Sequence, residues 1–140
     1  MFATGISPAN TAAALAALRL LNADPQRVAR LRRASELFLG LCKQRGLNTG
    51  ESNGTPIIPV ILGNSMHCLM LSNAMFKRGV NVKPILHPAV EESAARLRYF
   101  INSGHTPEQI RRTVDIMTEE LEKISPDYLS GASRSEPVSP

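Results

Sequence analysis

Two arginines on one predicted strand are the residues of this chain best suited to hold an anion. Arg96 and Arg98 stand at positions i and i+2 of the segment ARLRYFIN, and on a β-strand that spacing places both side chains on one face. Two guanidinium groups on one face are costly to bury unless an anion meets at least one of them. The pattern therefore predicts a site that holds a carboxylate, which a planar guanidinium can grip through two parallel hydrogen bonds.

The three histidines and one serine are weaker candidates for chemistry. His87 lies in the loop before the arginine strand, and we expect it to line a channel through which a substrate enters. His105 precedes a helix start and is interpreted as a structural histidine. Ser7 has no GxSxG context and is interpreted as a helix cap. Because no HxxxH or HExxH spacing occurs, no metal site is predicted.

Composition limits the class of protein. The 140 residues fit one domain or a piece of a larger protein, with 43% hydrophobic and 20% charged residues and a net charge of +4, which are typical of a soluble globular protein. Cys42 and Cys68 form no CxxC motif, so we expect reduced thiols in a cytoplasmic protein. No apolar run reaches the ~20 residues that span a bilayer, and the start shows no secretory-signal pattern. No membrane partner is expected.

The first predicted helix, 9–21, is apolar nearly all round. It begins after the Ser7-Pro8 pair and carries no charge until Arg19. Such a helix is not a surface helix, so another domain or subunit should cover it. The segment 1–22 is therefore predicted to face a partner.

The remaining elements predict an α+β fold. Asp24 and Pro25 are predicted to begin a helix that ends at Gly46, and Thr106 begins the last helix with a capping box to Gln109. The other predicted elements are a strand at 55–63 that lies at a sheet edge because of its two prolines, a helix at 65–78, and strands at 80–85 and 94–102. We expect a small, mainly antiparallel sheet covered by helices on one face. A serine- and proline-rich tail, 125–140, is predicted to be disordered.

Four sequence blocks carry a resemblance to a known family. They are FATGISPAN, TPIIPVILG, RGVNVKPILHPAV and ARLRYFINSGHTPEQI, and the resemblance covers residues 2–124. The chain resembles the C-terminal part of the α-oxoamine synthases, pyridoxal-phosphate enzymes of the aminotransferase class I/II fold (fold type I). Members include 5-aminolevulinate synthase, 2-amino-3-ketobutyrate CoA ligase, 8-amino-7-oxononanoate synthase and serine palmitoyltransferase.

The resemblance implies a function and a division of the chain. Members are acyltransferases that condense an amino acid with an acyl-CoA or acyl-carrier thioester, with pyridoxal 5'-phosphate as electron sink, and the parent enzyme is expected to be a homodimer. The resemblance implies that Arg98 holds the amino-acid carboxylate and that Thr4 contacts the cofactor phosphate of the neighbouring subunit. Residues 1–22 would link from a large cofactor domain, and residues 23–124 would form the small C-terminal domain.

One departure from the family pattern is large. None of the four lysines stands in the serine- and lysine-containing motif that carries the family's Schiff-base lysine. The chain is therefore expected to be a fragment with no catalytic residue of its own.

Two alternatives to this reading stay open. The first is a non-catalytic interaction module that docks through the apolar first helix. The second is a nucleic-acid binder that uses the basic helix face, on which four arginines lie at 27, 30, 32 and 33. A nucleic-acid partner is not expected, because aromatic residues are few and acidic residues flank the cluster.

Overall fold

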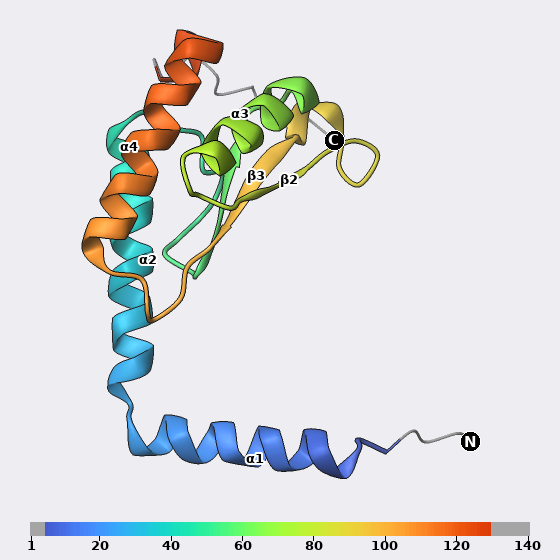
Figure 1. Cartoon of the computed structure of the whole chain (residues 1–140), viewed down its shortest axis with the longest axis vertical. Coiled ribbons are helices and arrows are strands. Elements are labelled where there is room, and N and C mark those ends of the chain that lie inside the picture. Colours follow the sequence, from blue (N-terminus) through green and yellow to red (C-terminus); the bar gives the residue numbers. More distant parts are fainter. Residues whose placement is uncertain (1–4, 130–140) are drawn as a thin grey trace.

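The computed structural model describes residues 5–129, which form four α-helices, a three-stranded sheet and two short 3₁₀ helices (Figure 1). The elements in chain order are α1 (Pro8–Ala23), α2 (Gln26–Gln44), β1 (Ile57–Ile61), α3 (Ser65–Lys77), β2 (Lys83–Ile85), η1 (Glu92–Ala94), β3 (Arg96–Phe100), α4 (Pro107–Ile124) and η2 (Pro126–Leu129). This order matches the order predicted from the sequence. The strands are shorter than predicted, since only the central residues of 55–63 and 94–102 and the last three of 80–85 pair.

The sheet has the strand order β1-β3-β2, and both pairs are antiparallel. β1 lies at an edge, as its prolines predicted. Pro59 is paired with Arg98, and the neighbouring amide of Ile61 donates to the carbonyl oxygen of Asn48 at 2.8 Å, away from β3. A proline on that outward side removes no ladder hydrogen bond. The arginine strand β3 is therefore the central strand.

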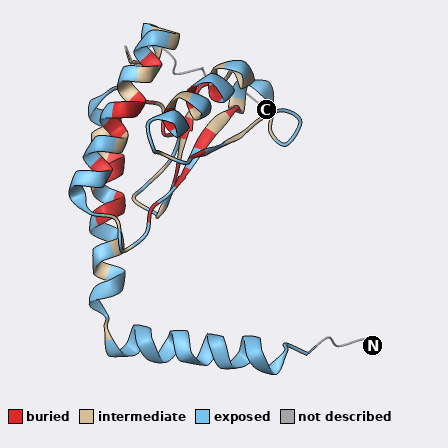
Figure 2. Ribbon diagram, in the orientation of Figure 1, coloured by how far each residue is buried: buried red, intermediate tan, exposed pale blue. Residues whose placement is uncertain are grey.

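Helices α2, α3 and α4 cover one face of the sheet and enclose the core (Figures 1 and 2). The alternation predicted for β3 is confirmed, because Leu97, Tyr99 and Ile101 are buried while Arg98 and Phe100 are exposed. The largest fully buried side chains from the helices are Phe38, Leu71, Met75, Met117 and Leu121. The α+β prediction, with helices on one face of a small antiparallel sheet, is confirmed.

The last helix forms as predicted, and the second begins differently. The side chain of Thr106 accepts from the Gln109 amide while the Gln109 side chain accepts from the Thr106 amide, which completes the capping box. In α2 the N-cap is Pro25, with no side-chain cap hydrogen bond. The Asp24 carboxylate interacts with the Gln26 amide at the start of α2, as a capping residue would, and it also pairs with Arg30 at 2.9 Å and Arg27 at 3.3 Å.

Helix α1 stands away from the rest of the fold (Figure 1), and every residue in it is exposed (Figure 2). Its side chains Leu15, Leu18, Leu20 and Leu21 are all more than 40% exposed. Ser7 caps the helix through the Asn10 amide, as predicted. The described residues thus give α1 no apolar cover, and its burial by another domain or subunit stays a prediction.

The start of the predicted tail is ordered, contrary to expectation. Residues Pro126–Leu129 form η2, whose Tyr128 hydroxyl lies 2.7 Å from Nδ1 of His67 on α3. Tyr128 and Leu129 also pack against the core. Disorder was predicted from Ser125 because the segment lacks an apolar period, but two apolar side chains suffice to dock one short turn. Residues 130–140 lie outside the described part of the chain.

Candidate functional site

The candidate site lies on the face of the sheet that none of the helices within residues 5–129 covers. Arg96, Arg98 and Phe100 point to this face because successive side chains of β3 alternate and their neighbours fill the core. Phe100 is 58% exposed, and Ile57 beside it on β1 is 47% exposed. Large apolar side chains of this kind rarely gather on a free protein surface, so the face is suited to contact with another body.

Arg98 is exposed and makes no ion pair with a described carboxylate. Its guanidinium carbon lies 5.1 Å from the centre of the Phe100 ring, a cation–π contact. Lys83 lies directly opposite on β2, which places a second cation on the same face. The strand register thus adds Lys83 to the strand positions that flank the predicted arginine pair.

Arg96 has a structural role. Its Nε donates to the carbonyl oxygen of Ala94 at 2.8 Å, which fixes the turn into β3. Glu92, which lies four residues before Arg96, accepts two hydrogen bonds from Ser65, one from the hydroxyl and one from the amide at the start of α3. These bonds, with a smaller contribution from the charge of His87, lower the pKa of Glu92.

His87 and His105 lie on other segments of the described chain. His87 is exposed on the loop after β2, and its charge interacts with Glu92. His105 lies at the corner between β3 and α4, where its ring nitrogens are 3.3 Å and 3.1 Å from the amide nitrogen and Nδ2 of Asn102. The predicted hydrogen bonding of His105 at this corner is present, and its purely structural role stays a prediction. Thr4 lies outside the described residues.

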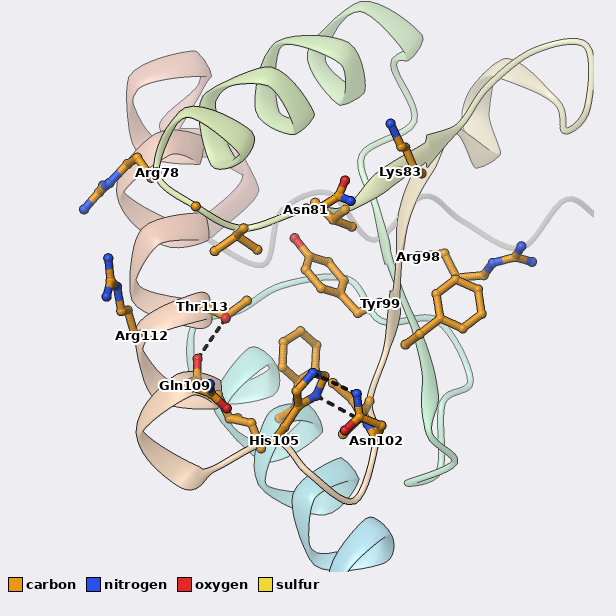
Figure 3. Close-up of a pocket in the computed structure, with 17 residues that line it drawn as sticks. Arg78, Asn81, Lys83, Arg98, Tyr99, Asn102, His105, Gln109, Arg112 and Thr113 are labelled. Atoms are coloured by element: carbon orange, nitrogen blue, oxygen red, sulfur yellow. Dashed lines mark hydrogen bonds between the residues drawn. The ribbon is translucent and has the colours of Figure 1, made fainter. Parts of the chain in front are cut away.

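A cavity of about 670 Å³ lies at the sheet edge, between the start of α4 and residues 79–82, which lead into β2. Its walls include Tyr99 of β3 (Figure 3) and Ile101, the residue after β3. The Arg98 side chain points away from the Tyr99 ring, to the other side of the strand (Figure 3). Sequence reasoning missed this cavity, because it is formed by segments about twenty residues apart that follow no common motif.

The described residues do not form a site that fits pyridoxal phosphate. All four lysines are exposed, and Lys123 is paired with Glu120 at 2.8 Å. None of them stands in the motif of the Schiff-base lysine. Within residues 5–129, no group of three or more potential ligand side chains could hold a metal ion, and no helix is long and apolar enough to cross a membrane.

Known proteins share both the sequence and the fold of this chain. The family described as aminotransferase class I and II matches residues 1–117. The 8-amino-7-oxononanoate synthase of Thermosipho melanesiensis is 36% identical over 124 residues, which are 89% of this chain and 30% of that protein. The enzyme of the same name from Treponema denticola is 34% identical over 116 residues, or 83% of this chain and 29% of that protein.

Solved structures of proteins with the same names or fold also match this chain. The 8-amino-7-oxononanoate synthase of Francisella tularensis superimposes with a TM-score of 0.74 at 25% identity, over 89% of this chain and 36% of that chain. A serine palmitoyltransferase from S. paucimobilis gives a TM-score of 0.78 at 23% identity, over 89% of this chain and 31% of that chain, and shows a shared fold. This chain thus spans about a third of the length of its relatives, and it belongs to the class I and II aminotransferase family, in its α-oxoamine synthase branch.

Proposed function

We propose that this chain is the small domain of a pyridoxal-phosphate-dependent acyltransferase that condenses an amino acid with an acyl-CoA or acyl-carrier thioester. In this proposal Arg98 binds the α-carboxylate of the amino acid. The observation that carries it is the position of Arg98 on the open sheet face, next to Lys83 and without a carboxylate partner among the described residues. An anion bound there would offset the repulsion between the two cations.

The open surfaces support the idea that a larger protein completes the site. The sheet face around Ile57 and Phe100 is exposed, and so is every apolar side chain of α1. The relatives named 8-amino-7-oxononanoate synthase are about three times as long as the matched segment. We propose that the additional part of a complete enzyme covers both surfaces and supplies the Schiff-base lysine and cofactor pocket, and that the enzyme is a cytoplasmic homodimer.

The residues of this chain would bind and position the substrate. The Phe100 ring holds the Arg98 guanidinium in place through the 5.1 Å contact, so fewer rotamers need to be frozen when the acid arrives. Arg98 can then meet the carboxylate with two parallel hydrogen bonds. His87 would lie at the rim, on the loop that leaves β2, and Thr4 would contact the cofactor phosphate of a second subunit.

A hybrid enzyme tests this proposal. Residues 1–124 would replace the matching segment of the Thermosipho melanesiensis 8-amino-7-oxononanoate synthase, and amino-acid KM and kcat would be measured. We expect Arg98→Ala to lower kcat/KM for the amino acid by roughly thirtyfold or more, since loss of a desolvated charge pair costs about 2–5 kcal/mol. The control Arg111→Ala, an exposed arginine on α4, should leave both constants unchanged.

Two outcomes would contradict the assignment. An active hybrid whose amino-acid KM and kcat survive Arg98→Ala would show that another group holds the carboxylate. A decrease in the affinity for the thioester alone would place Arg98 in the acyl pocket instead.

A non-catalytic role as an interaction module has one observation in its favour, the exposure of α1. Sedimentation of the chain distinguishes the two proposals, because a module that docks through α1 should form a defined dimer or complex and Leu18→Glu should abolish it. The nucleic-acid alternative is weakened, since Arg27 and Arg30 already pair with Asp24.

A further inference from the structure

The cavity at the sheet edge exists because the ladder between β2 and β3 stops early. The last pair joins Lys83 to Arg98. The next residues toward the N-terminus of β2 diverge from β3, and both segments line a cavity of about 670 Å³. That volume falls in the range of small-molecule sites, roughly 300–1,000 Å³.

The backbone N–H and C=O of Phe100 face the cavity and make no hydrogen bond to a neighbouring strand in the described structure. The Ile101 amide donates to the Pro56 carbonyl at 2.8 Å, on the β1 side. Because the backbone groups of a strand alternate in direction, those of Phe100 face the opposite side, beyond the end of β2. Asn81 would be the next partner in the register, but no backbone hydrogen bond joins it to Phe100 in the described structure. The Phe100 N–H and C=O are therefore available to a ligand.

The charges around the cavity all have one sign. Four cationic residues and no aspartate or glutamate appear among the described residues that line it. Arg78 at its mouth is already paired with Glu119 and Glu120, and Arg98 points away (Figure 3). Arg112 on α4 is exposed and has no hydrogen bond or ion pair with a described side chain (Figure 3). It is the guanidinium in this wall that is free to meet an acid.

The deeper wall of the cavity is apolar. It is formed by side chains from α2, the segment before β2, the residue after β3 and α4, namely Phe38, Val80, Val82, Ile101 and Ile110. An apolar floor lined by two uncommitted cations, Arg112 and Lys83, and by one free backbone donor fits a small amphipathic anion.

We propose that this cavity binds an organic carboxylate with a compact aromatic or branched body. The acid group pairs with Arg112, the apolar body lies on the wall that includes Val82 and Ile110, and the Phe100 amide is within the same cavity as an additional donor. The proposal does not depend on the role assigned to Arg98.

The test uses the full 140-residue chain, labelled with ¹⁵N, and the probe naphthalene-2-carboxylate in a two-dimensional NMR titration. We expect saturable shifts confined to the amides of residues 79–83 and 99–113. Naphthalene-2-carboxamide has nearly the same shape without the charge and should bind at least tenfold more weakly. Acetate, which lacks the apolar body, should give no saturable shift at the concentrations that saturate with the naphthoate.

Neighbouring arginines on α4 provide a matched pair of variants. Arg112→Gln should weaken naphthoate binding at least tenfold, whereas Arg111→Gln, whose side chain does not line the cavity, should change it less than twofold. Both side chains are exposed, so neither change is expected to unfold the chain.

Several results would overturn the proposal. The first is equal affinity for the carboxylate and the carboxamide. The second is an equal effect of Arg112→Gln and Arg111→Gln on naphthoate affinity. The third is a set of NMR shifts spread over the exposed leucines of α1 and the exposed face of α3. Absence of a saturable shift at millimolar naphthoate, or a spectrum showing that the chain does not form the sheet edge, would overturn it as well.

Discussion

Lys83 and Arg98 lie directly opposite each other on the antiparallel strands β2 and β3, so their cationic side chains share the open face of the sheet. Arg96 lies on the same face, while the facing residues of β1 are Ile57, Pro59 and Ile61. The strands therefore place three cations and no carboxylate on one side of this small sheet. Like charges directly opposite destabilise a strand pair.

Replacement of Lys83 by glutamine is expected to stabilise the chain. Loss of the repulsion with Arg98 should raise the free energy of unfolding by about 0.2–1 kcal/mol, and the gain should shrink in high salt because exposed charges are screened. Urea unfolding at low and high ionic strength measures both effects. Lys77→Gln is the control. Lys77 lies in the last turn of α3, where its positive charge interacts favourably with the negative end of the helix dipole, so its replacement should not stabilise the chain. A Lys83→Gln variant less stable than the parent chain would show that the repulsion is already relieved.

Pyridoxal phosphate is expected not to form a specific adduct with this chain. The four lysines are exposed, and none has the family's Schiff-base context. After borohydride reduction, peptide mapping by mass spectrometry should find weak labelling spread over several lysines. Lys83→Gln tests the lysine closest to Arg98. One stoichiometric adduct at a single lysine would contradict the inference that the chain lacks a cofactor site.

Both cysteine thiols are expected to react slowly with a disulfide reagent at pH 8. Burial raises the pKa of Cys42 to about 12, and burial together with the charge of Glu92 raises the pKa of Cys68 to about 11. Because the thiolate is the nucleophile, almost none of either group reacts at pH 8 in the folded chain. The chain in urea should react rapidly, and the variants Cys42→Ala and Cys68→Ala assign each rate. A fast phase in the folded chain would place one thiol at the surface.

Acid should remove the contribution of Glu92 to stability. Its hydrogen bonds from Ser65 lower the folded-state pKa below the ordinary value of 4.5. A lowered pKa stabilises the fold above the unfolded-state value, and this gain is lost as the pH falls through the folded-state pKa. The difference in unfolding free energy between the parent chain and Glu92→Gln should therefore be larger at pH 7 than at pH 3.

The neighbouring residue Glu91 controls for the general effect of acid. Its carboxylate is exposed and makes no hydrogen bond or ion pair with a described residue. Glu91→Gln should be nearly neutral at both pH values. If the difference in unfolding free energy between the parent chain and Glu92→Gln is the same at pH 7 and pH 3, the charge of the Glu92 carboxylate does not stabilise the start of α3.

The sequence by itself determined the order of the elements, the arginine strand and its two faces. Alternation along β3 is a local property, so the residue pattern alone assigns Leu97 and Tyr99 to the core and Arg98 to the other face. The capping box at Thr106 is likewise recognisable from four consecutive residues of the sequence. The family blocks added the role proposed for Arg98.

The tertiary structure alone decided which residues meet across the chain. Strand register places Lys83 beside Arg98, Ser65 rather than Arg96 engages Glu92, and the contact between His67 and Tyr128 orders a turn in the segment predicted to be disordered. The cavity beside Phe100 exists because the pairing of β2 with β3 ends at Lys83 and Arg98 and does not continue to Asn81 and Phe100. These features depend on the distance between segments far apart in sequence, and local spacing carries no information about that distance.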